Sequence, residues 1–146
     1  MKKLFLSAVV VAVIALFVYG GHHSTFTSEP IFTESANDAI LASAFEKQAS
    51  NIQVEGRGTV ATVLPDDNDG SRHQRFVVRL GSGQTILITH NIDLAPRVSS
   101  LNEGDVIAFS GEYEWNPKGG VIHWTHRDPD HRHPAGWLRH HGKTYQ

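Results

Sequence analysis

Cysteine is absent from the sequence. Its absence excludes disulfide bonds, thiolate metal sites, a cysteine nucleophile and a lipid anchor on cysteine, so the fold must be stabilised by packing. The G-x-S-x-G and H-E-x-x-H motifs are also missing. The sequence therefore carries no motif for a serine hydrolase or for a helical zinc protease.

A large excess of charge of either sign is lacking too. The formal net charge is −2, with 40% hydrophobic and 19% charged residues, which indicates a folded chain that is not globally basic. Residues 118–146 differ, because they contain five Lys or Arg and six His against two Asp. This basic tail predicts weak nucleic-acid binding. Its positive charge increases at about pH 5, because the imidazoles become protonated.

The N-terminus has the pattern of an export signal. Lys2 and Lys3 precede residues 4–19, a mostly apolar run without charge, so residues 1–20 are predicted to be a signal peptide or a membrane anchor. A cleaved signal leaves a periplasmic protein, whereas a retained one anchors the chain in the inner membrane through residues 4–19. In both cases the remainder lies outside the cytoplasm, with room for one domain of roughly 90 to 110 residues.

A linker and a short helix are predicted next. Residues 21–34 mix polar residues, Gly and Pro without a period, which is typical of a linker. Ser35 and Asp38 have the spacing of a capping box, in which Asp38 reaches back to the Ser35 amide, and a helix is expected over residues 35–50. A narrow apolar stripe is expected to cover one end of the following domain, and consists of Ala36, Ile40, Leu41, Ala44, Phe45 and Gln48.

From residue 53 the hydrophobic period changes to two, which predicts β-strands. The first three strands are expected at residues 53–64, 74–80 and 84–91, and the polar residues 65–71 end the first of them. In the first, Gly58, Val60, Thr62 and Leu64 are expected to share a face. A tight turn at residues 81–83 pairs Phe76 with Ile88 and Val78 with Ile86, and places Gln74 and His90 on one face.

Two further strands follow, at residues 106–115 and 121–126, joined by a type I turn at residues 116–119. This turn places Glu112 opposite His123. One face is expected to form part of the core, and it consists of Ile107, Phe109, Tyr113, Trp115, Ile122 and Trp124. The predicted fold is all-β, a five-stranded OB-like Greek-key barrel over residues 53–146 with one short N-terminal helix and an irregular C-terminal tail. The alternative is an open, sandwich-like sheet of the same strands.

Three motifs also resemble a bacterial domain-of-unknown-function family of small exported proteins. They are DDNDGSRHQRF at residues 66–76, HNIDLAPR at residues 90–97, and GEYEWNPKGGVIHWTH at residues 111–126. The resemblance covers about residues 53–145 and implies an exported OB-like domain. It implies no catalytic residues, because the family has no assigned reaction.

The histidines of the tail are candidate metal ligands. The candidates are His123, His126, His131, His133, His140 and His141, of which the first four are the favoured set. Neutral imidazoles bind zinc or another divalent transition metal when three or four of them converge. His123 and His126 point to opposite faces of a continuous strand, so they converge only if the strand ends near Thr125. The alternative is a solvated basic tail whose histidines contact nothing specific.

The function predicted for this architecture is binding of an extended polar ligand, namely single-stranded nucleic acid, glycan or peptide. The candidate contacts are His73, Arg75, Arg79, His90, Trp115 and Trp137. A metal-dependent hydrolase or nuclease is the first alternative; its nuclease form would use Asp66, Arg79 and Asp93, but Arg97 stands where the general base is needed. A structural envelope protein is the second alternative.

Overall fold

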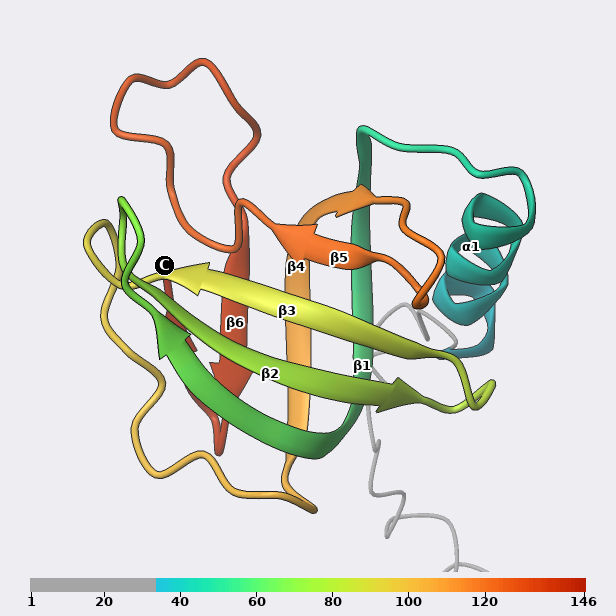
Figure 1. Ribbon diagram of the computed structural model, residues 1–146, viewed down its shortest axis with the longest axis horizontal. Helices are drawn as coiled ribbons and strands as arrows, with labels where there is room; N and C mark the ends of the chain where they lie inside the picture. Colours follow the sequence, from blue (N-terminus) through green and yellow to red (C-terminus); the bar gives the residue numbers. More distant parts are fainter. Residues whose placement is uncertain (1–33) are drawn as a thin grey trace, which may run out of the picture. The chain divides into compact units, whose positions relative to one another are not determined.

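The computed structural model describes residues 34–146, where one short helix precedes a seven-stranded sheet (Figure 1). The predicted export segment, and the predicted linker up to residue 33, lie outside the described residues. Within the part described, no helix is long and apolar enough to cross a membrane.

The helix α1 (Glu34–Glu46) confirms the predicted helix, although it ends earlier. Gln48, with φ of 52°, adopts the left-handed conformation that ends many helices. Leu41 and Ala44 are buried in the core, whereas Ile40 is exposed. The predicted capping box is wrong, because α1 begins before Ser35 and the buried Asp38 accepts a hydrogen bond from the Ser82 amide at 2.8 Å. Asp38 therefore ties α1 to the turn that follows the second strand.

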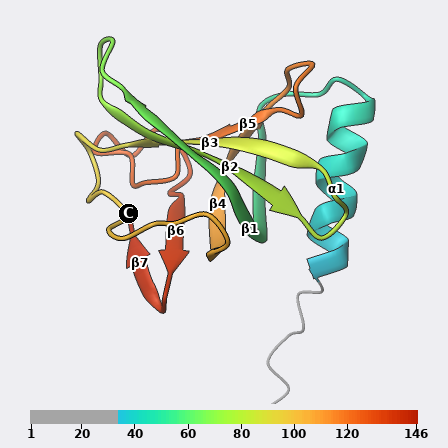
Figure 2. The ribbon, with the colours of Figure 1, turned by 60° about the horizontal axis from the view of Figure 1, so that its bottom comes forward.

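Seven strands form the sheet: β1 (Ile52–Asp67), β2 (His73–Leu80), β3 (Thr85–Asn91), β4 (Val106–Glu114), β5 (Val121–His123), β6 (Trp137–His140) and β7 (Lys143–Tyr145). Their order is β1-β2-β3-β5-β4-β6-β7, and β1 also pairs with β4, so the first five strands close into a ring. The β3–β5 pairing is parallel and the other pairings are antiparallel. Figure 2 shows β6 and β7 side by side beyond β4.

The strand β1 is longer than predicted. It continues through Pro65 to Asp67, so the predicted break at residues 65–71 is wrong for its first three residues. Pro65 lies where the β1–β2 register shifts between Leu64 and Asp67. Proline has no amide proton, and at an irregular position of this kind the regular pattern of hydrogen bonds between the strands does not need one. A second shift between Val60 and Thr62 reverses the alternation, so Thr62 is exposed and does not share the buried face of Val60 as predicted.

The β2–β3 hairpin has the predicted register. Phe76 pairs with Ile88 and Val78 with Ile86, and all four side chains are fully buried. Gln74 pairs with His90 on the same inward face. Gln74 holds the chain after β3 by two hydrogen bonds with the backbone of Val98, at 2.9 and 3.1 Å.

The β4–β5 hairpin also has the predicted register, with Glu112 opposite His123 and Tyr113 opposite Ile122. However, β5 ends at His123 and not at His126, because Trp124 leaves the strand with φ of 54°. The prediction that Trp124 belongs to the core is therefore wrong. Its side chain is half-buried, outside the core cluster.

The C-terminal tail is not irregular as predicted, since its end forms the hairpin β6–β7. The strand β6 extends the sheet beside β4, pairing Leu138 with Phe109. Leu138 and Tyr145 are buried in the core. The two turn residues His141 and Gly142 have φ of 47° and 76°, which is the left-handed geometry of tight hairpins. The apolar side chains of this hairpin complete the core.

Candidate functional site

A small pocket lies where β2 begins and where β3 and β5 end. It encloses about 190 Å³ and is lined by His73, Thr89, Asn91, Leu94, His123, Trp124 and His126. Thr89 and Asn91 alternate along β3 with the buried Ile88 and His90, so they point away from the core. His73 pairs with Asn91 across the hairpin. The pocket is therefore built on the outer face of the sheet, from several separate segments.

Trp124 supplies the aromatic wall of this pocket. Its ring stacks on His133, with ring centroids 4.3 Å apart and planes inclined by 8°, and lies 5.5 Å from the ring of His126. A bulky residue with positive φ is uncommon and costs free energy on the order of 1–3 kcal/mol. Surrounding contacts must therefore hold the indole in place, and the stacking on His133 is one of them.

The segment from 124 to 136 is fixed by a buried carboxylate. Asp128 accepts hydrogen bonds from the amides of Asp130 at 3.0 Å, Arg132 at 2.8 Å and His133 at 3.0 Å. These amides hold the pKa of Asp128 below its ordinary value of 3.8. Asp128 therefore stays ionised at neutral pH and positions His133 against Trp124.

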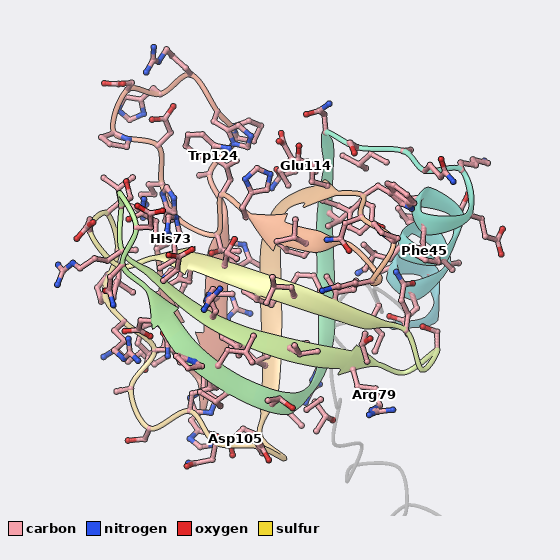
Figure 3. All side chains as sticks on the ribbon, in the orientation of Figure 1. Phe45, His73, Arg79, Asp105, Glu114 and Trp124 are labelled. Carbon is pink, nitrogen blue, oxygen red and sulfur yellow. The ribbon has the colours of Figure 1, made fainter. Side chains whose placement is uncertain are left out.

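Carboxylates and imidazoles alternate beside the pocket. His133 Nε2 lies 2.8 Å from Glu112 Oε2, and His123 Nε2 lies 3.5 Å from Glu112 Oε1 and 3.4 Å from Glu114 Oε2. Partial burial lowers the pKa of His133, but hydrogen bonds to Glu112 and to the Pro134 carbonyl outweigh this effect and raise it above 6.5. Figure 3 shows Glu114 and Trp124 near each other along the same edge of the molecule. This group, Glu112, Glu114, His123 and His133, is the acid–imidazole cluster.

His90 lies in the core beneath the pocket and not in it. Its Nδ1 lies 2.8 Å from Thr125 Oγ1 and its Nε2 lies 3.1 Å from the Pro96 carbonyl oxygen. A carbonyl only accepts, so Nε2 donates and Nδ1 accepts from the hydroxyl. Burial lowers the pKa of His90 from 6.5 to about 4, and the ring is neutral at physiological pH. Because His90 is fully buried, it does not fit the predicted role of ligand contact.

The other predicted ligand residues are dispersed. His73 lines the pocket, and Arg75 follows on the same face of β2, where its Nε donates to the Pro65 carbonyl at 3.1 Å. Arg79 is six residues from His73 along β2, a separation of roughly 20 Å. Figure 3 shows His73 and Arg79 at opposite ends of this strand. One site on the scale of this pocket cannot use both residues.

Neither predicted tryptophan lines the pocket. Trp115 packs against the core and lies 6.5 Å from Phe45 of α1. Trp137 begins β6, where the guanidinium of Arg139 lies 4.8 Å from its ring centroid. The tryptophan that does line the pocket is Trp124, which the hydrophobic alternation of the hairpin assigned to the core.

The four histidines predicted to bind metal occupy different surroundings. His123 and His126 line the same pocket, as an early end of the strand requires, and His133 is bound to Glu112. His131 is exposed. The three potential ligands with atoms within 4.8 Å of one another in the described residues lie elsewhere, and are Asp105, His140 and His141.

The nuclease arrangement is not assembled either. Asp66 forms a bidentate pair with Arg97, at 2.6 and 2.9 Å, and Asp93 is paired with Arg72 at 2.7 Å. The pairing with Arg97 holds the pKa of Asp66 below its usual value. Arg79 lies near the opposite end of the β1–β2 ladder from Asp66, since Arg79 pairs with Thr59 and Asp67 with His73.

Several pocket residues were missed by sequence reasoning. Thr89 lies in no motif, and Asn91 and Leu94 belong to the HNIDLAPR stretch, which indicated a family resemblance but no binding role. Glu112 was identified only as a partner of His123. The Asp128-Pro129 dipeptide is the available sequence signal, because it begins the turn closed by the hydrogen bond from the His131 amide to the Asp128 carbonyl.

Fold and pocket together define a mostly β protein in which a closed ring of five strands carries a small polar pocket on its outer face. The chain belongs to the family described as "Protein of unknown function (DUF3465)", whose model matches residues 21–146. Comparison with curated proteins gives no match.

Proposed function

We propose that this protein is an exported, OB-like binding module that holds an extended polar ligand at the pocket beside Trp124. The observation that carries the proposal is the backbone of Trp124, whose positive φ directs a large indole toward hydrogen-bonding side chains from β2, β3 and β5. Strained residues of this kind cluster at binding and active sites. The export part rests on residues 1–20 of the sequence alone.

The strand arrangement supports the OB-like part. The ring order β1-β2-β3-β5-β4, with β3 and β5 parallel, is the arrangement expected for a five-stranded Greek-key barrel. OB folds bind extended chains on the face of their second and third strands. The pocket lies on the outer face at the ends of β2 and β3, which is the corresponding place.

The charge around the pocket favours a glycan over a nucleic acid. Proteins that bind nucleic acid neutralise phosphates with Lys and Arg, and the seven lining residues include neither. Glu112 and Glu114 lie beside His123 and would repel a polyanion at neutral pH. Imidazole, hydroxyl and amide groups next to an indole suit a neutral ligand with many hydroxyl groups.

The test is a titration of isotopically labelled protein, followed by NMR, with three probes used separately. They are an uncharged chito-oligosaccharide, an oligo-dT strand and a neutral decapeptide. We expect the oligosaccharide to shift the signals of Trp124, His73 and Asn91. The Trp124→Ala variant should lose this binding by at least about fivefold, because stacking on one aromatic ring is worth about 1–3 kcal/mol.

The matched control is Arg79→Ala, which changes an exposed residue at the far end of β2 and should bind like the unchanged protein. The proposal fails if none of the probes shifts these signals at millimolar concentration, or if the shifts map onto Arg79 and its neighbours. Stronger shifts with oligo-dT than with the sugar would retain the pocket and overturn the glycan assignment.

Metal-dependent hydrolysis remains the second candidate on one observation. His123 Nε2 is buried without a hydrogen-bond partner in the described part of the chain, although two carboxylates lie within 4 Å. Such a nitrogen can coordinate a metal cation together with the carboxylate of Glu112 or Glu114. If the protein is a hydrolase, zinc should enable it to cleave p-nitrophenyl acetate or p-nitrophenyl phosphate, and His123→Ala should abolish the rate. A rate equal to that of zinc in buffer excludes this candidate for those ester classes.

A further inference from the structure

A second group of polar side chains lies away from the pocket, where the C-terminal hairpin meets the start of β4. Asp105 directly precedes β4, His140 is the last residue of β6, and His141 begins the turn into β7. His140 pairs with Ile107 in the β4–β6 ladder, which keeps it close to Asp105. In Figure 3, Asp105 lies at the opposite edge of the molecule from Trp124.

The distances within this group are close to those of a metal site. One ligand atom from each of Asp105, His140 and His141 lies within 4.8 Å of the others, and His140 Nε2 is 3.0 Å from Asp105 Oδ2. Ligands bound tetrahedrally to zinc at about 2.0–2.1 Å are about 3.3–3.4 Å apart. A cation would therefore take the place of the His140–Asp105 hydrogen bond with a shift of a few tenths of an ångström, and the exposed His141 ring would rotate to point its in-plane lone pair at the ion.

The turn explains why two consecutive histidines face the same cation. Successive side chains of an extended strand point to opposite faces. His141 has φ of 47° and Gly142 has φ of 76°, and this left-handed turn carries the second imidazole around to the first. The rings stack with centroids 3.9 Å apart and planes inclined by 26°.

The group is also ordered before any ion binds. His140 is 2% exposed and is fixed by the sheet, whereas His141 is exposed and leaves one side open to solvent. The Asn102 amide donates a hydrogen bond to Asp105 Oδ2 at 2.8 Å and orients the carboxylate. Such supporting contacts strengthen metal affinity, because Asp105 and His140 are already held in place before the ion binds.

From these contacts we propose that Asp105, His140 and His141 bind a divalent transition-metal ion of the zinc type. Two imidazoles and one carboxylate favour zinc, copper or nickel over calcium or magnesium, which prefer oxygen ligands only. Water from the open side completes the coordination. The ion cross-links the β6–β7 hairpin to the residue that precedes β4. Asp105 and His140 are 35 residues apart, and the chain between them includes β5 and the Trp124 segment. The site is independent of the ligand pocket and does not use its histidines.

The experiment uses the full chain, purified without a histidine tag, with zinc sulfate competing against a chromophoric chelator. We expect one zinc per chain, bound at about micromolar Kd or tighter, and a Tm that rises by about 5 °C or more at excess zinc. The imidazole signals of His140 and His141 should move together in the NMR spectrum. Calcium and magnesium at the same concentration should leave both Tm and spectrum unchanged.

His141→Asn is the decisive variant, and His131→Asn is its control. Both histidines are exposed and have left-handed backbones, with φ of 47° and 55°, which asparagine tolerates. The His141 variant should fold with an unchanged Tm in chelator and bind zinc at least about tenfold more weakly, whereas the His131 variant should match the unchanged protein. Asp105→Asn provides a second variant, with the same expected loss of zinc.

Equal zinc affinity in the His141→Asn variant and the unchanged protein would overturn the proposal. So would zinc binding that is lost in His123→Ala or His133→Ala but retained in His141→Asn, because the ion would then belong to the acid–imidazole cluster. The absence of zinc binding tighter than about 100 µM would mean that His140 and Asp105 form only a hydrogen-bonded pair.

Discussion

Single residues set the acid sensitivity of this fold, and His90 is the clearest case. It is neutral in the folded protein because its pKa is lowered from 6.5 to about 4 by burial. The unfolded chain therefore binds more protons than the folded chain between these two pH values. Stability contributed by the neutral ring is complete above pH 6.5 and is lost as pH falls toward 4.

We expect His90 to remove roughly 3 kcal/mol of stability as the pH falls across this interval. His90→Gln should be less stable at neutral pH, since its hydrogen bonds to Thr125 and Pro96 must be remade, but its stability should fall less steeply with acid. Urea unfolding at several pH values measures both slopes. A difference between the two proteins that does not vary with pH would contradict this account.

Trp124 is the second residue whose own conformation matters. Its φ of 54° penalises any side chain with a Cβ, and glycine escapes that penalty. Both Trp124→Ala and Trp124→Gly lose the stacking on His133. The difference in stability between the two variants therefore reports the cost of the left-handed backbone conformation. The glycine variant should be more stable than the alanine variant by about 1 kcal/mol in urea unfolding. The opposite order would show that the left-handed backbone carries no cost.

At the scale of elements, the segment between β5 and β6 is held by close backbone contact. The amide of Gly136 donates to the His126 carbonyl at 3.0 Å. A Cβ at Gly136 would overlap the Trp124 carbonyl oxygen and would lie 2.5 Å from the Ser110 carbonyl oxygen. Backbone atoms cannot move aside as a flexible side chain does, so the two ends of the segment come together only if residue 136 is glycine.

Gly136→Ala should therefore cost about 2–4 kcal/mol and weaken ligand binding at the pocket, since the strain acts on Trp124. Ala135→Gly, at the exposed neighbouring position, is the control and should cost about 1 kcal/mol or less. Thermal unfolding of both variants compares them directly. An unchanged Tm for Gly136→Ala would mean that the segment relaxes freely and does not brace Trp124.

For the molecule as a whole, the C-terminal hairpin is part of the core and not an appendage. Leu138 is fully buried and Tyr145 is 3% exposed, and β6 covers the edge of β4 that the ring leaves open. Deleting residues 134–146 would uncover this apolar surface and leave residues 107–110 of β4 without a partner strand on that edge. The pocket segment would lose its attachment at Gly136 in the same step.

We expect the truncated chain to lose cooperative unfolding, as judged by circular dichroism and NMR dispersion. Leu138→Ala alone should cost about 2–5 kcal/mol, because it leaves a cavity in a packed core. Arg139→Ala, on the exposed side of the same strand, should change stability by about 0.5 kcal/mol or less. A truncated chain that unfolds cooperatively with the original Tm would contradict the assignment of β6 and β7 to the core.

Local pattern determined the parts of this protein that neighbouring residues control. Alternation and turn chemistry predicted the β2–β3 register and the pairing of Glu112 with His123, because a short turn fixes both strands at once. The same rules predicted α1 and placed His123 and His126 near the end of a strand. The sequence alone also predicts an exported chain, through residues 1–20.

Only the tertiary structure decided where Trp124 and the C-terminal hairpin lie. Alternation places Trp124 in the core, but its left-handed backbone depends on Gly136 and His133, residues that become neighbours only when the chain has folded. The grouping of Asp105 with His140 likewise joins residues 35 apart in the sequence. Contacts of this range depend on the packing of the whole sheet, and a pattern confined to a few neighbouring residues contains no information about them.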